Sequence, residues 1–87
     1  MTNNQKIILE SLSMDLLRAS LGRYRGSHKM AERFITESER WIAELKDFRN
    51  KDILQQIRQC LSRNDNRQAE DLLMYSTLIR NRSVSNV

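Results

Sequence analysis

The chain has 87 residues, a mass of 10.3 kDa and a formal net charge of +4, and 39% of its residues are hydrophobic. This length predicts one small domain, and the hydrophobic share is too high for a fully disordered chain. With no proline and only two glycines, the sequence lacks the frequent turns of an all-β fold. No apolar run is long enough for a transmembrane helix, and the N-terminus lacks a signal-peptide pattern, so we expect a cytoplasmic protein that does not cross a membrane.

Apolar residues recur at helical spacing along most of the chain, which predicts an all-α protein. The first predicted helix spans 5–21. Asn3 or Asn4 can cap it, because a short polar side chain accepts a hydrogen bond from an exposed N–H. Ser13 and Asp15 fall on polar positions away from the apolar face. The predicted buried face consists of Ile8, Leu9, Leu12, Leu16 and Ala19, with Ile7, Leu17 and Leu21 beside it.

The two glycines, Gly22 and Gly26, follow this helix closely and predict a bend or short loop, with Ser27 as the next N-cap. The second predicted helix spans 28–48. Its apolar residues follow alternating steps of three and four, and we expect it to be the central helix of the fold. Its predicted buried face consists of Ala31, Phe34, Ser38, Trp41, Leu45 and Phe48, widened by Ile35 and Ile42.

A third helix is predicted over 51–63, with Asn50 as its N-cap, and a fourth over 67–81 after a turn at 64–66. The short connections favour antiparallel neighbours. We therefore expect a small four-helix bundle in one domain, 1–81, in which two longer helices precede a short αα-hairpin. Residues 82–87 are polar and are predicted to be a frayed tail.

A core of this size supplies little stability, and no disulfide or evident metal site adds to it. Self-association or a permanent protein partner would remedy this, and dimers with two-fold symmetry are the commonest solution. The second helix carries more large apolar residues than three short partners easily cover. We expect its face to take part in such contacts through Phe34, Trp41, Leu45 and Phe48.

A basic cluster lies around the glycine loop, where residues 23–33 hold four basic side chains against Glu32, a net charge of +3. Arginine binds phosphate well because its guanidinium is planar and permanently charged. An aromatic ring between arginines is typical of proteins that contact single-stranded nucleic acid. The alternative is that these charges pair locally on an exposed helix. The candidate anion-binding or nucleic-acid-binding residues are Arg23, Tyr24, Arg25, Lys29 and Arg33.

The single histidine completes an Arg-x4-His spacing, from Arg23 to His28. This spacing resembles the motif of the helical HEPN domains, which cut RNA in toxin–antitoxin and defence systems. In that family a dimer brings the arginine and the histidine of both chains to one scissile phosphate. The resemblance therefore implies an alternative function, an RNase-like dimer built on Arg23 and His28.

Other chemistry has little support in the sequence. Cys60 occupies an apolar helical position and is expected to be a buried free thiol, and a single cysteine excludes a cysteine-rich zinc site. No phosphate-binding loop or dinucleotide fingerprint is present, so we expect no cofactor and no metal. The sequence favours a non-enzymatic helical protein-interaction module that self-associates and acts as an adaptor, a regulator or a subunit. A small basic nucleic-acid-binding protein is the main alternative.

Overall fold

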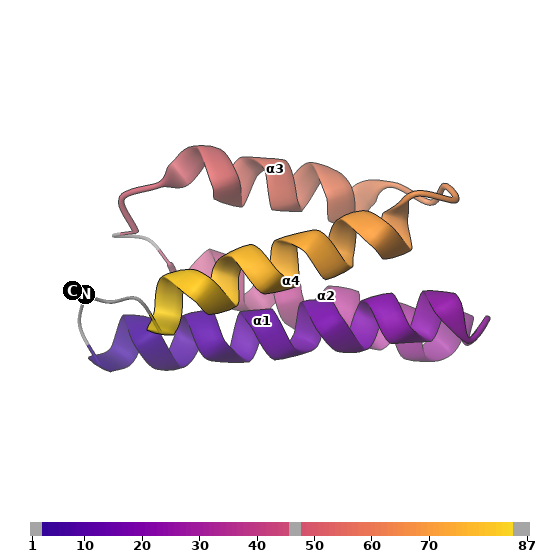
Figure 1. Cartoon of the computed structure of the whole chain (residues 1–87), viewed down its shortest axis with the longest axis horizontal. Coiled ribbons are helices and arrows are strands. Elements are labelled where there is room, and N and C mark those ends of the chain that lie inside the picture. The colour runs from indigo at the N-terminus through magenta and orange to yellow at the C-terminus, as the bar shows by residue number, and fades with distance from the viewer. Residues whose placement is uncertain (1–2, 46–47, 85–87) are drawn as a thin grey trace.

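Four helices make up the computed structural model, which describes residues 3–45 and 48–84, and none of these residues forms a strand. Figure 1 shows α4 lying between α3 and α1, with α2 behind them. The predicted all-α, four-helix bundle is thus confirmed. The helices are α1 (Asn3–Tyr24), α2 (His28–Glu44), α3 (Lys51–Ser62) and α4 (Gln68–Val84).

The central helix is α1, which packs along both α2 and α4, whereas α3 lies mainly against α4. The expectation that the second helix is central was therefore wrong. The reason lies in the distribution of apolar residues. Apolar side chains occur on all sides of α1, so it can present one face to α2 and another to α4, while α2 has a single apolar face. Leu9, Leu12 and Leu16 are fully buried between these neighbours.

The helix ends differ from the predicted ones in the first half of the chain. Helix α1 begins at Asn3 and continues past Leu21 to Tyr24, so both asparagines are helical and the predicted loop shortens. Helix α2 begins after the predicted N-cap, Ser27, whose hydroxyl accepts a hydrogen bond from the backbone N–H of Met30 at 3.3 Å. It ends at Glu44, whereas the prediction continued to residue 48 through positions 46 and 47, which lie outside the described residues.

In the second half, Asn50 caps α3 as expected, since its side-chain oxygen accepts a hydrogen bond from the N–H of Ile53 at 3.2 Å. Helix α4 continues to Val84 and is as long as α2, so the second helix pair is not uniformly short. Arg82 and Ser83 were assigned to a frayed tail but are helical, and Ser83 is buried. Residues 85–87 lie outside the described residues.

Buried serines hold α1 against α4. The hydroxyl of Ser13 donates to the backbone oxygen of Ser76 at 2.9 Å, and the hydroxyl of Ser76 donates to the backbone oxygen of Ser13 at 2.8 Å. Further along, the hydroxyl of Ser20 donates to the backbone oxygen of Ala69 at 2.8 Å. These pairs define an antiparallel register. They also correct the prediction for Ser13, which is buried because its hydroxyl finds a partner on α4.

The two glycines, Gly22 and Gly26, have different structural roles. Gly22 lies inside α1, where an added Cβ would come within 2.7 Å of the backbone nitrogen of Ala31, so a side chain there would push α1 and α2 apart. Gly26 lies in the turn with a φ of 73°, a backbone conformation that favours glycine. Only Gly26 is therefore a loop residue in the sense that the sequence suggested.

Candidate functional site

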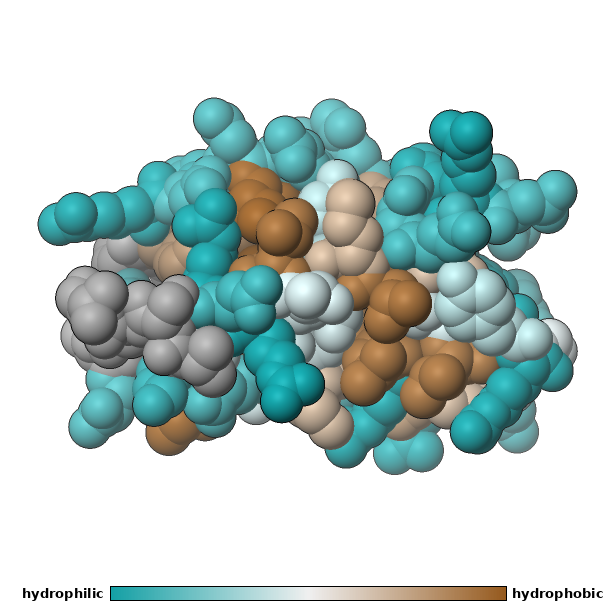
Figure 2. All heavy atoms as spheres, in the orientation of Figure 1, coloured by the Kyte–Doolittle hydropathy of each residue, from teal (hydrophilic) through white to brown (hydrophobic). Residues whose placement is uncertain are grey.

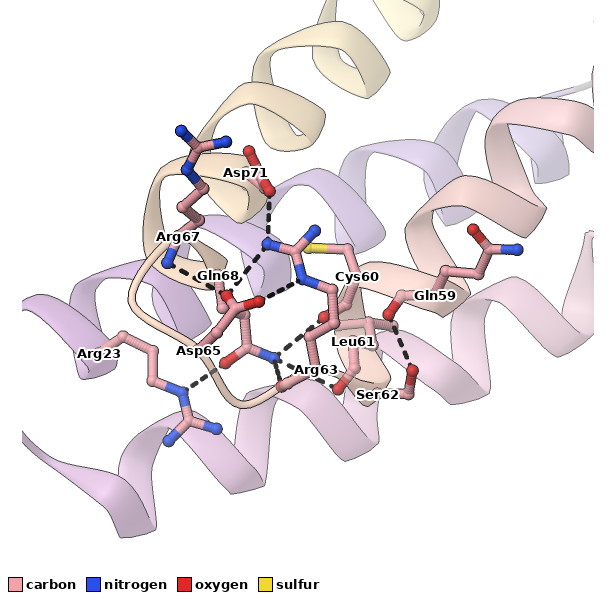
Figure 3. A network of polar contacts seen from close by, with 10 residues as sticks. All are labelled: Arg23, Gln59, Cys60, Leu61, Ser62, Arg63, Asp65, Arg67, Gln68 and Asp71. Carbon is pink, nitrogen blue, oxygen red and sulfur yellow. Dashed lines mark hydrogen bonds and ion pairs between the residues drawn. The ribbon is translucent and has the colours of Figure 1, made fainter.

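Arg23 was predicted to bind anions, but its side chain points into the protein and is only 15% exposed. Its Nε donates to Oε1 of Gln68 at 2.7 Å (Figure 3). One terminal nitrogen lies 3.2 Å from Nδ1 of His28, and the other donates to Oε1 of Glu32 at 2.9 Å. All three guanidinium nitrogens thus contact protein atoms, and the arginine ties α1 to α2 and α4.

Gln68 completes this contact from the first residue of α4 and is fully buried. Its side-chain nitrogen donates to the backbone oxygens of Cys60 at 3.0 Å and of Arg63, which lie at the end of α3. In Figure 3 the side chain lies between Arg23 and the last turn of α3. One glutamine therefore connects three helices. Sequence analysis missed it, because glutamine after a polar turn carries no pattern that distinguishes a buried side chain from an exposed one.

The α3–α4 turn holds a cluster of ion pairs. Arg63 donates to both carboxylate oxygens of Asp65, each at 3.1 Å, and to Asp71 at 2.6 Å. The hydrogen bonds from Arg63 hold the pKa of Asp65 below its usual value. Beside them, burial raises the pKa of the Cys60 thiol to about 11, so this thiol is protonated at neutral pH. The cluster closes the turn, and Cys60 is the buried free thiol that the sequence predicted.

The other residues of the predicted basic cluster lie on the surface. Tyr24, Arg25, Lys29 and Arg33 are all exposed. The Arg33 guanidinium lies 5.3 Å from the ring centre of Phe34, a cation–π contact. A shallow pocket of about 360 Å³ lies over the start of α2, lined by Ser27, Lys29, Met30, Arg33 and Phe34. The structure therefore separates Arg23 from the four other candidates.

The predicted interaction face of the second helix belongs largely to the fold. Leu45 and Phe48 are buried in the core, and Phe34 and Trp41 are half-buried against it. The indole Nε1 of Trp41 donates to a carboxylate oxygen of Asp15 at 2.8 Å, which explains why this aspartate is buried although the sequence placed it on a polar position. All four side chains therefore pack against other residues of the same chain.

Large apolar side chains are instead exposed along α1 and α4. Their exposed fractions run from 37% at Leu21 to 58% at Ile7. Because Ser13 lies opposite Ser76 and Ser20 opposite Ala69, the half-buried Leu17 and the exposed Leu73 fall at the same level, on the outside of the contact between the two helices. Figure 2 shows apolar residues gathered over α1 and α4. We call this surface the outer α1–α4 face; its residues are Ile7, Met14, Leu17, Leu21, Tyr24 and Leu73.

Sequence analysis missed this face as a surface. Ile7, Leu17 and Leu21 were placed beside the buried face of the first helix, where the pattern alone makes them members of the core. The signal that could have found it is the distribution of apolar residues on all sides of this helix, since two neighbours cannot cover every side.

Within the described ranges, no group of three or more His, Cys, Asp or Glu side chains could hold a metal ion. None of the helices described is both long and apolar enough to cross a membrane. No known protein-family model matches this chain, and comparisons with curated proteins and with solved structures gave no significant match.

Proposed function

We propose that this chain is a non-enzymatic protein-interaction module that binds through the outer α1–α4 face. The observation that carries the proposal is the row of exposed apolar side chains Ile7, Met14 and Leu21, which recur every seven residues along the central helix. Exposure of such side chains to water raises the free energy of the protein, and a group of them on one surface marks a site that binds another molecule.

The continuity of the face supports binding to a helical partner. Leu17 lies between the members of this row, and Leu73 extends the surface onto α4. A helix with apolar residues on every side is normally buried on every side. The side of α1 that faces neither α2 nor α4 therefore has the composition of an interface.

The contacts of Arg23 support a structural role for the Arg-x4-His pair. A terminal nitrogen of Arg23 lies 3.2 Å from Nδ1 of His28 within one chain. However, the same guanidinium is bonded to Glu32 and Gln68, so a phosphate would have to displace protein partners from it. These contacts favour a structural role for the pair, in which Arg23 connects α1 to α2 and α4, over a role in catalysis.

The binding function is tested by cross-linking a tagged chain in its own cells and identifying the attached proteins. Met14→Glu with Leu73→Glu should reduce recovery of bound proteins at least ten-fold, because each charge would be buried in the contact. The matched control, Met74→Glu with Leu78→Glu, adds the same charges at exposed apolar positions on the side of α4 away from α1, and should leave recovery unchanged. Circular dichroism verifies that each variant is folded.

Equal recovery by the wild-type chain and the Met14/Leu73 variant would contradict the proposal. So would a wild-type chain that recovers no protein, including a second copy of itself.

Nucleic-acid binding is a second proposal, supported by the exposure of Tyr24, Arg25, Lys29 and Arg33 around one end of the bundle. With Arg23 engaged, three basic side chains remain, so the logarithm of the affinity should fall with that of salt concentration with a slope of about −2 to −3. Lys29→Glu with Arg33→Glu should abolish binding in fluorescence anisotropy with labelled RNA and DNA. The control Arg58→Glu with Arg82→Glu changes the net charge by the same amount and should retain most of the nucleic-acid binding. No binding at low salt would refute this alternative.

A further inference from the structure

Ion pairs engage most of the acidic side chains at the end of the bundle where α1 ends and α2 and α4 begin (Figure 1). Glu32 is bonded to Arg23. Asp65 and Asp71 are both bonded to Arg63. This end therefore carries basic side chains that are exposed and form no ion pair with any described residue. They are Arg25, Lys29, Arg33 and Arg67.

Arg67 joins this surface from the second half of the chain. It directly precedes α4, is exposed, and in Figure 3 its guanidinium points away from the carboxylate of Asp65. The start of α4 lies beside the end of α1, so Arg67 and Arg25 belong to the same end of the bundle. Among the described residues of this end, Glu70 is the one acidic side chain outside the ion pairs. The unpaired charge is therefore positive.

A pocket of about 370 Å³ lies between the end of α1 and the α3–α4 turn, and we call it the turn pocket. Its lining residues are Arg23, Tyr24, Asn64, Asp65, Asn66 and Ala69. Both charged side chains in this lining are already bonded to other residues. The remaining groups are the ring of Tyr24, which is 56% exposed, and the amides of Asn64 and Asn66, which are exposed and bonded to no described residue. The free groups of the turn pocket are thus aromatic or neutral and polar.

A nucleotide in a single strand matches this division between a neutral pocket and a basic surround. A nucleobase is flat and uncharged, stacks on aromatic rings and presents donors and acceptors on its edges, and an asparagine amide can bond two of them. The phosphates of the strand attract arginine and lysine. An acidic protein would use the cations but not the aromatic ring and the amides. The volume lies at the lower end of the range of about 300–1,000 Å³ for ligand sites, which suits one small group.

We propose that this end of the bundle binds single-stranded RNA or DNA, with one base stacked on Tyr24 in the turn pocket. The phosphates on either side of that base contact Arg25 and Arg67. A base inside a duplex is stacked between its neighbours and cannot reach the ring, so single strands are preferred. This inference rests on the nucleic-acid-binding alternative under the proposed function and names its ligand.

Fluorescence anisotropy with labelled oligonucleotides of about 12 nucleotides tests the stacked base. The wild-type chain should bind single strands about ten-fold more tightly than a duplex of the same sequence. Tyr24→Leu should lower the affinity for single strands at least about five-fold and leave that for the duplex unchanged. Tyr24→Phe keeps the ring and should bind as the wild type does. Asn64→Ala with Asn66→Ala should reduce the differences in affinity among strands of different bases.

The salt dependence of binding tests the part played by Arg67. Arg67→Ala should lower the affinity for single strands about five-fold and make the slope of log affinity against log salt less steep by about 0.7, the share of one phosphate contact. Arg80→Ala is the matched control, because Arg80 is exposed on α4 about 18 Å from the start of that helix. This separation exceeds two Debye lengths at physiological salt, so the control should bind as the wild type does.

Equal affinity for duplex and single strand, a Tyr24→Leu chain that binds like the wild type, or an unchanged slope in Arg67→Ala would each overturn the inference. Nucleic-acid binding itself would survive these results. No binding of any oligonucleotide at low salt would overturn both, and so would binding of anionic lipid vesicles through Arg67 in place of single strands. The protein-interaction function is judged separately, by the Met14/Leu73 variant.

Discussion

Gln68→Ala should lower the free energy of unfolding by about 3 kcal/mol, because the change leaves buried polar groups without partners and opens a cavity. The Nε of Arg23 loses its acceptor, and the backbone oxygens of Cys60 and Arg63 lose a donor. These groups belong to α1 and to the end of α3, whereas Gln68 itself belongs to α4, so the loss is not confined to one turn. Urea denaturation monitored by circular dichroism measures the change.

Two further variants sharpen this test. Gln59→Ala removes the same side chain from an exposed position on α3 and should change stability by less than about 0.5 kcal/mol. Gln68→Glu keeps the size and an acceptor for Arg23 but loses the donor to the backbone oxygens, so it should also be destabilised. If Gln68→Ala were as stable as Gln59→Ala, the three-helix connection would be energetically unimportant.

Gly22→Ala should destabilise the protein by about 2 kcal/mol, although alanine is the better helix former by about 1 kcal/mol. The added Cβ would lie 2.7 Å from the nitrogen and 3.0 Å from the Cα of Ala31. Both are backbone atoms, so no side-chain rotation can relieve the clash, and α1 and α2 must separate. Thermal unfolding should show a fall in Tm of about 8–16 °C.

Gly26→Ala is the comparison. A Cβ at Gly26 meets no atom within 4 Å, and its cost is the backbone conformation alone, about 1 kcal/mol. A Gly22→Ala protein more stable than Gly26→Ala would show that the two helices separate easily, contrary to the close approach in the structure.

Local signals in the sequence were sufficient to predict the four helices and the N-caps of two of them. Ser27 and Asn50 are N-caps because a short polar side chain at that position bonds the first turn of its own helix, an interaction that needs no distant partner. The same periodicity could not predict which helix is central, because that depends on how many other helices pack against each one. Helix α1 packs along two helices, and the only sequence feature that indicates this is the presence of apolar residues on all its sides.

The candidate site was harder to predict, because the roles of its polar residues are set by partners far along the chain. Arg23 is bonded to Gln68, 45 residues away, and Asp15 to Trp41, 26 residues away. Composition and spacing treated Arg23 as one member of a basic cluster with Arg25. Arg23 lies in the last turn of α1 and Arg25 lies just after it. Spacing alone could not show that Arg23 packs inside the protein while Arg25 remains exposed.

The exchange of hydrogen bonds between Ser13 and Ser76 also has a consequence for protein synthesis. These residues are 63 positions apart and belong to the first and last helices. Chains grow at about 5–20 residues per second, so α1 waits roughly 3–12 seconds on the ribosome before its main partner has been made. During this time α2 can cover one side of α1, while its α4-facing leucines and serines stay open to chaperones or to other nascent chains.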